Sequence, residues 1–232
     1  MTTSPSDAAS AAHSATSTHT IWDLPIRLYH WLMVALVVLQ FGTAEFGWLS
    51  MQWHFWFGYA LLALLIFRIA WAFVGSENVR LRRLLSGPKT IFNYLRHWRQ
   101  TPVARHSGHN PLGGWSTLIM VSVLMLQALS GLATHDDIEW YGPLSERLPA
   151  AWIDAANWLH HRLPNVLWLL VAVHVLAIIQ YALFKRENLV ASMLHGKRDI
   201  DVAAPRLASN ARALIVLAIS VGAVAALLVW AE

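Results

Sequence analysis

The sequence predicts an all-α membrane protein, a bundle of four transmembrane helices with a fifth transmembrane helix at the C-terminal end. Composition is the first reason. Of the 232 residues, 56% are hydrophobic and 13% are charged, whereas an average soluble domain carries roughly 25% charged residues. A soluble protein of this size cannot bury so much apolar surface. The second reason is that the apolar residues gather in five stretches, each near the roughly 20 residues that a bilayer span requires.

The five predicted spans cover residues 25–45, 52–73, 113–134, 158–184 and 211–230. Residues 1–20 are rich in Ser, Thr and Ala and contain no Lys or Arg. They lack the basic region that opens a secretory signal, so we expect a flexible polar tail. The predicted organisation is therefore a tail (1–20), a four-helix transmembrane domain (21–200), and a linker with the fifth helix (201–232).

The positions of the basic residues predict how the chain is oriented. If the N-terminus is cytoplasmic, fourteen of the 17 Lys and Arg residues fall in cytoplasmic segments, and Arg68 falls at the inner end of the second span. Only Arg147 and Arg162 lie outside. The positive-inside rule thus favours an inside N-terminus and an outside C-terminus. Topology also accounts for the net charge of +4, so we expect membrane lipid, and no nucleic acid, as a partner.

Histidines are the chemistry-bearing residues of the predicted spans. With no cysteine in the chain, thiolate-bound clusters and covalently attached haem are excluded. Ionisable side chains inside a span are costly and usually functional. His30 lies in the first span, His54 in the second, and His160, His161 and His174 in the fourth. A single histidine of this kind is as often a hydrogen-bonded structural residue as a ligand, but several on three helices favour ligands.

Depth and helical phase sort these histidines into two pairs. The first span runs outward and the fourth inward, so His30 and His174 share the inner depth, while His54 and His160 share the outer one. At about 100° per residue, the fourteen residues from His160 to His174 leave a mismatch of about 40°, against about 140° from His161. His160 and His174 therefore share a face, about 21 Å apart along the axis.

Two histidines from different helices, opposite one another, suit the six-coordinate iron of a non-covalent b haem. Gly42, Gly58 and Gly131 could allow a flat ring to approach the helices closely. Arg27 precedes His30 by three residues, on the same helical face, and is a candidate to bind a haem propionate. A metal-ion transport site would instead need a central carboxylate, which the spans lack.

Three motifs resemble the bacterial cytochrome b561 and nickel–iron hydrogenase b-type cytochrome family, over roughly residues 21–198. They are Trp-Asp-Leu-Pro-Ile-Arg-Leu-Tyr-His-Trp (22–31), Gly-His-Asn-Pro-Leu-Gly-Gly (108–114), and Arg-Glu-Asn-Leu-Val (186–190) followed by Gly-Lys-Arg (196–198). The resemblance implies a four-helix bundle with two b haems in the bacterial inner membrane. It implies the iron ligands His30, His54, His160 and His174, although this sequence has His161 where the family often has Glu.

The resemblance also implies a quinone near the inner haem, because related subunits bind quinone there. By that analogy His109, Asn110, Pro111 and Gly113 are a candidate quinone wall. The alternative is purely structural, since Asn-Pro-Leu-Gly-Gly also makes a turn and a helix start.

We therefore predict a di-haem b-type cytochrome that relays electrons between a periplasmic redox protein, such as a cytochrome c or a hydrogenase, and the quinone pool. An acidic outer loop could steer a basic partner, although a solvated loop fits equally; its acidic residues are Asp136, Asp137, Glu139, Glu146 and Asp154. Three alternatives stay open: an oxidoreductase of the same fold that acts on a small reductant such as superoxide, a histidine-based metal-ion transporter, and a structural membrane anchor.

Overall fold

A computed structural model describes residues 17–100, 108–136 and 138–232. Within them, five helices are long and apolar enough to cross a membrane. Much of their apolar surface faces outward, as in Leu214 (67% exposed) and Val229 (71%), which suits lipid and not water. The chain is therefore an all-α, multi-pass membrane protein, and its spanning helices are α1 (Leu24–Glu45), α2 (Met51–Val74), α5 (Pro111–Gly131), α6 (Ala150–Lys185) and α8 (Asn210–Ala231).

Two of the predicted spans differ from the helices at their outer ends. Helix α5 stops at Gly131, three residues before the predicted end, and α6 begins at Ala150, eight residues before the predicted start. At 36 residues, α6 is about 54 Å long, which exceeds the roughly 30 Å of a hydrocarbon core. Hydropathy alone misses its first turns because they carry polar residues, including Asp154 and Asn157.

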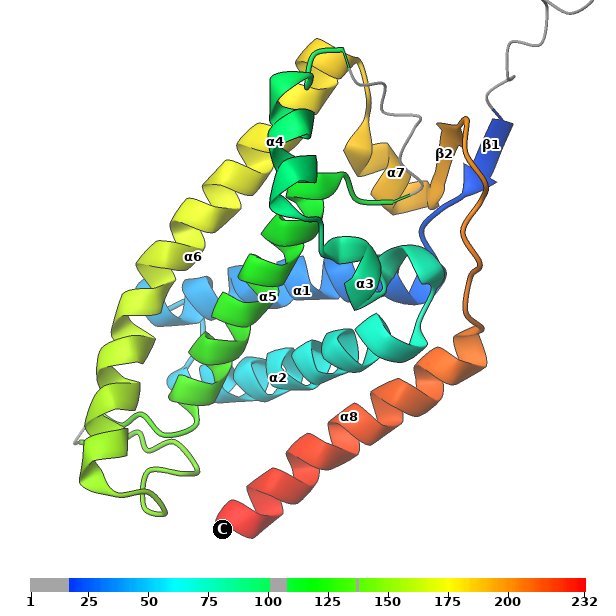
Figure 1. Cartoon of the computed structure of the whole chain (residues 1–232). Coiled ribbons are helices and arrows are strands. Elements are labelled where there is room, and N and C mark those ends of the chain that lie inside the picture. The colour runs from blue at the N-terminus through cyan, green and yellow to red at the C-terminus, as the bar shows by residue number, and fades with distance from the viewer. Residues whose placement is uncertain (1–16, 101–107, 137) are drawn as a thin grey trace, which may run out of the picture.

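The spanning helices form two pairs that cross at a steep angle (Figure 1). Helices α1 and α2 run side by side, α5 and α6 make the second pair, and α8 packs along α2. One end of the bundle, called the inner end below in keeping with the predicted orientation, gathers the short elements. These are β1 (Ser17–Thr20), η1 (Glu77–Val79), α3 (Leu81–Leu84), α4 (Pro88–Arg96), α7 (Leu189–His195) and β2 (Lys197–Ile200).

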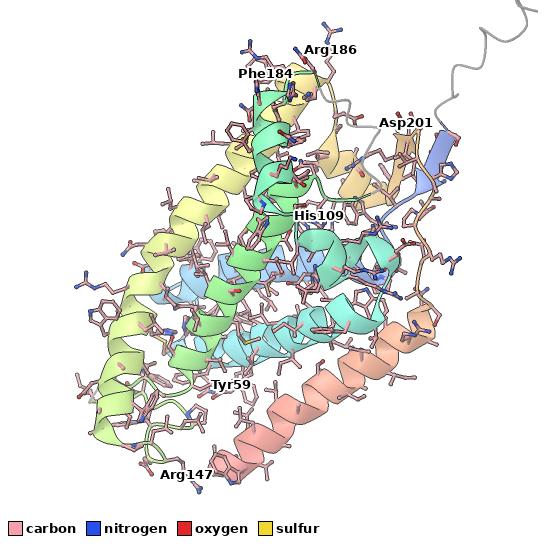
Figure 2. The ribbon with its side chains drawn as sticks, in the orientation of Figure 1. Tyr59, His109, Arg147, Phe184, Arg186 and Asp201 are labelled. Atoms are coloured by element: carbon pink, nitrogen blue, oxygen red, sulfur yellow. The ribbon has the colours of Figure 1, made fainter. Side chains whose placement is uncertain are left out.

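The C-terminus lies at the opposite, outer end of the bundle (Figure 1). There the guanidinium of Arg147, in the loop before α6, lies 5.6 Å from the centre of the Trp230 ring. Figure 2 shows Arg147 beside the last turn of α8. This cation–π contact joins α8 to the outer loop. Helix α8 is thus held by two elements, the outer loop and α2.

The prediction of a flexible tail up to residue 20 is wrong for its last four residues. Ser17–Thr20 form β1, which pairs antiparallel with β2 so that Ser17 faces Ile200 and Thr20 faces Lys197. The pairing continues beyond β1 toward the start of α1, because the backbone N–H groups of Ile21 and Trp22 donate to the Gly196 carbonyl at 2.8 and 3.1 Å. Composition could not reveal this strand, whose partner is almost 180 residues away in the sequence. Residues 1–16, Arg105 and Asp137 lie outside the described residues.

A buried carboxylate joins three helical segments at the inner end. Asp23 is 4% exposed and is the N-cap of α1, accepting from the Ile26 N–H at 2.7 Å. Its second oxygen accepts from the Trp71 indole at 3.3 Å and from the Ser76 hydroxyl. The Ser76 oxygen in turn accepts from the Ala208 N–H at 2.8 Å. Asp23 thus fixes the start of α1 against the end of α2 and the segment that leads into α8.

We expect Asp23→Ala to destabilise the protein by about 3–7 kcal/mol. It removes a helix cap, which is worth about 1 kcal/mol, and leaves two buried donors without an acceptor, at about 1–3 kcal/mol each. Ser209→Ala is the matched control, because Ser209 caps α8 from an exposed position and should cost about 1 kcal/mol or less. Thermal unfolding of the detergent-purified variants measures both. Equal losses in the two variants would contradict the role assigned to Asp23.

Candidate functional site

The structure brings two of the sequence-predicted histidines face to face near the outer end. His54, in the first turn of α2, and His160, in α6, have ring centroids 6.3 Å apart. Two imidazoles bound on opposite sides of one metal ion give a centroid separation of about 6 Å, because each metal–nitrogen bond is about 2 Å and each ring adds about 1 Å. The separation therefore fits one iron between the two rings.

The polar contacts of His54 fix its orientation. Its Nδ1 lies 3.1 Å from the Thr43 hydroxyl oxygen. That hydroxyl donates its own proton to the backbone carbonyls of Leu39 and Gln40, so it accepts from His54 Nδ1–H. The Gln40 amide donates to the His54 carbonyl at 3.1 Å. A protonated Nδ1 leaves Nε2 with a free lone pair, which is the form that binds a metal.

His160 is held in the same tautomer by the neighbouring helix α5. Its Nδ1 lies 3.1 Å from the Gln127 carbonyl oxygen, which can only accept, and the Gln127 side chain donates to the His160 carbonyl at 3.1 Å. Gly131 makes room for the ring, because a Cβ there would lie 2.8 Å from His160 Cε1. His161 is exposed, and its Nδ1 is bound to the Asn157 carbonyl at 2.8 Å.

A cavity of about 340 Å³ surrounds the two facing rings. Its walls are mostly apolar, with Phe41 and Leu167 among them, and carboxyl groups of Glu45 and Asp136 line it toward the outer loop. The backbone N–H groups of Trp140, Ile138 and Glu139 hold the pKa of the Asp136 carboxyl below its usual range. The outer side of the cavity therefore carries fixed negative charge at neutral pH.

A second group of histidines lies toward the inner end. His30 of α1 is within electrostatic range of His174 of α6, and its Nδ1 is buried without a hydrogen-bond partner among the described residues. Helix α6 continues without a break through Pro164. The fourteen residues from His160 to His174 therefore span about 21 Å along one helix.

His109, just before α5, is the third histidine of this inner group. Its ring packs edge-on against Trp22 at 4.9 Å, and its Nδ1 is buried without a hydrogen-bond partner in the described part of the chain. Burial, followed by the positive charges of Arg68 and Arg198, lowers the pKa of His109 to about 3. Figure 2 shows His109 in the interior between α5 and α3. The ring is therefore neutral at physiological pH.

Arg27 and Asn110, both predicted as cofactor-binding residues, make structural contacts. Arg27 donates from Nη2 to the Leu194 carbonyl of α7, and its Nε is buried without an acceptor among the described residues. Asn110 is the N-cap of α5, with Oδ1 accepting from the Gly113 N–H at 2.8 Å, and its amide nitrogen donates to the Tyr181 hydroxyl. The structural interpretation of Asn-Pro-Leu-Gly-Gly, a turn and a helix start, is thus what this segment forms.

The sequence predicts that glycines on the spanning helices let a flat ring approach closely, and the structure differs between Gly131 and Gly42 in this respect. Gly131 accommodates the His160 ring. The space beside Gly42 is filled by Trp48, whose ring would lie 2.0 Å from a Cβ at that position.

Sequence reasoning missed the residues that orient the histidines, namely Thr43, Gln127 and Ser130, whose hydroxyl lies 3.3 Å from His160 Nδ1. The available signal was a polar residue in the outer half of an otherwise apolar helix. These groups complete a site of neutral imidazoles in an apolar cavity. That donor set suits a b haem, whose iron takes imidazole ligands and whose porphyrin needs an apolar surround.

Comparison with known proteins agrees with this chemistry. The family model described as prokaryotic cytochrome b561 matches residues 21–196. A probable Ni/Fe-hydrogenase B-type cytochrome subunit of Rhizobium leguminosarum bv. viciae is 24% identical over 213 residues, covering 77% of this chain and 87% of that protein. Its counterparts in Azotobacter vinelandii and Cupriavidus necator are 25% and 26% identical, each over 77% of this chain and 87% and 86% of their own lengths. The chain therefore belongs to the prokaryotic cytochrome b561 family, whose members are membrane-spanning b-type cytochromes of electron transport.

Proposed function

We propose that this cytochrome holds two b haems and relays electrons across the bacterial inner membrane, between a periplasmic redox protein and the quinone pool. The observation that carries the proposal is the facing pair His54 and His160. Their Nδ1 atoms lie against the Thr43 hydroxyl and the Gln127 carbonyl, so a metal would take the Nε2 atoms, and Nε2 of His160 lies 3.4 Å from the Gln127 amide nitrogen. We assign the outer haem to this pair and the inner haem to His30 and His174.

The chain's own residues set the properties of each site. When bound, a b haem supplies reversible one-electron chemistry at an iron ligated by two imidazoles. The Thr43 hydroxyl and the Gln127 carbonyl keep their histidines in the ligating tautomer and raise the basicity of the free nitrogen. The walls of the outer cavity are mostly apolar, which suits a porphyrin. No general acid or base is needed for electron transfer between the two sites.

We propose that the periplasmic partner docks on the acidic outer side. Asp136 lines the outer cavity and is held ionised by three backbone N–H groups. A negative rim steers a partner that carries a positive docking surface. The three relatives are named as hydrogenase cytochrome subunits, so a hydrogenase is the partner that we favour, with a small cytochrome c as the alternative. The Arg and Lys residues of the inner end support the inside location of the N-terminus.

We place the quinone beside the inner pair, against His109, Pro111 and Gly113. Support comes from the neutral His109 ring, whose Nδ1 is buried and whose pKa is lowered in part by His174 and His30. Asn110 enters this proposal as the residue that holds the wall in place, since both ends of its amide are bound within the protein.

The alternatives are less well supported. Superoxide is an anion, and the outer cavity offers it carboxylates, while Arg147 points at Trp230. A metal-ion transport site needs several ligands that converge, and across the described residues no group of three His, Cys, Asp or Glu side chains does so.

We expect His160→Ala to lower the haem content from two per chain to one, because it removes a ligand of the outer haem. His161→Ala is the matched control, since it changes the neighbouring residue of the same helix, whose side chain is exposed. Pyridine haemochrome quantitation on detergent-purified protein measures both. Two haems in His160→Ala, or one haem in His161→Ala, would refute the outer assignment. A wild-type protein without haem would refute the proposed function itself.

We expect the stability of the protein to fall as the pH drops below about 6.5, partly through His109. The unfolded chain binds a proton on this ring near pH 6.5, but the folded chain binds it only near pH 3. Each pH unit between these values therefore costs at most about 1.4 kcal/mol. His109→Phe should flatten the slope of thermal stability between pH 7 and pH 5. The exposed His195→Phe should leave the slope as it is, and a slope common to all three proteins would contradict the assignment.

A further inference from the structure

A second cavity, away from the histidine sites, lies at the inner tip of the bundle. It has a volume of about 350 Å³ and is lined by Trp98, Arg99, Phe184 and Lys185. The first two residues follow α4, and the last two end α6. Figure 2 shows Phe184 and Arg186 at this tip. The end of a spanning helix therefore contributes one wall of the cavity, and the lining combines two aromatic rings with two cations.

Direct contacts hold the two walls of this cavity together. The Lys185 ammonium donates to the Trp98 backbone carbonyl and lies 4.9 Å from the centre of the Trp98 ring. The Trp98 ring packs edge-on against Phe184 and Tyr181, with ring centroids 6.3 Å apart in both pairs. The hydroxyl of Tyr181 is hydrogen-bonded to that of Tyr94 in α4. The segment after α4 is therefore fastened to the end of α6 by aromatic packing, a cation–π contact and hydrogen bonds.

Both walls carry positive charge. Residues 88–100 contain three Lys or Arg residues and no Asp or Glu, and residues 181–186 contain two and again no Asp or Glu. The next residue, Glu187, is not part of the lining. Arg99 is exposed and forms no ion pair with the residues that the structure describes. An anion in the cavity would therefore meet two cations and no acidic side chain of the lining.

An exposed apolar strip runs along α6 up to this cavity. Leu176, Ile179 and Leu183 are 63%, 46% and 70% exposed, and their spacing of three and four residues places them on one face of the helix. The strip ends beside Phe184 of the lining, which is itself 64% exposed. A free inorganic anion has no use for such a strip, whereas the acyl chains of a lipid would lie against it. The surface therefore suits an anion that carries apolar chains.

We propose that this cavity binds the headgroup of an anionic phospholipid, with its phosphate between Arg99 and Lys185 and its acyl chains along the apolar strip. Basic pockets between transmembrane helices take anionic lipid headgroups in this way. The guanidinium donates paired hydrogen bonds to phosphate oxygens, and the ammonium adds a point charge. Trp98 and Phe184 suit the boundary between hydrocarbon and headgroups. The site goes beyond the electron-transfer function and does not depend on the haem assignment.

The test is the thermal unfolding of the detergent-purified full chain as dioleoyl phosphatidylglycerol is added, because a bound lipid raises the unfolding temperature. The lipid concentration at half the maximal shift measures the affinity. Arg99→Gln combined with Lys185→Gln should weaken it at least about tenfold. The matched control is Arg82→Gln combined with Lys89→Gln, which removes the same charge from exposed positions of the same end that do not line the cavity. It should keep the wild-type affinity.

Arg99→Gln alone keeps the test decisive if the double variant does not fold, because Arg99 is exposed and Lys185 then keeps its contacts with Trp98. It should weaken the affinity about fivefold. Dioleoyl phosphatidylcholine, which has no net charge, and inorganic phosphate should both give a smaller shift than phosphatidylglycerol. An equal shift with phosphatidylcholine would refute a headgroup site, and an equal shift with inorganic phosphate would identify a site for the free ion. Equal losses in the cavity and control variants would also refute the site.

Discussion

The buried carboxylate of Asp23 is the constraint on which the inner half of the structure depends. A carboxylate at 4% exposure must have its oxygens satisfied. Here the donors come from α1 itself, from Trp71 in α2, and from Ser76 after it. The same interaction therefore sets where α1 begins and where α2 ends. His30 lies two turns into α1, and Arg68 lies one turn before Trp71, so Asp23 also sets how these two side chains lie relative to each other.

The two helix pairs orient their metal-binding histidines in the same way. One helix carries the histidine, and its partner supplies the group that orients it. Thr43 of α1 binds His54 of α2, and Gln127 of α5 binds His160 of α6. In lipid, no water is available to form hydrogen bonds with a polar side chain. Each imidazole nitrogen therefore needs a hydrogen-bond partner or a metal within the protein. The two pairs cross steeply (Figure 1). The rings of His54 and His160, one from each pair, face each other with centroids 6.3 Å apart.

Periodicity and hydropathy predicted those parts of the protein that depend on local sequence. The spans follow from runs of apolar residues, and the separation of His160 from His161 follows from helical phase alone. The cap at Asp23 was also within reach, since Asp before a Leu-Pro pair is a helix-start signal. The β1–β2 pairing, the Thr43–His54 contact and the Gln127–His160 contact were not, because each joins residues of different elements. Helical spacing to His30 predicted Arg27 as a propionate-binding residue; the contact of its Nη2 with the Leu194 carbonyl joins separate elements and could not be predicted from that spacing.

The two ends of the bundle differ in charge, and this difference bears on electron flow. Glu45 and Asp136 line the outer cavity, while the positive charges of Arg68 and Arg198 lower the pKa of His109 at the inner end. Negative charge near a redox centre favours its oxidised state, and positive charge favours its reduced state. On the proposed assignment, the outer haem is therefore the weaker electron acceptor and the inner haem the stronger one.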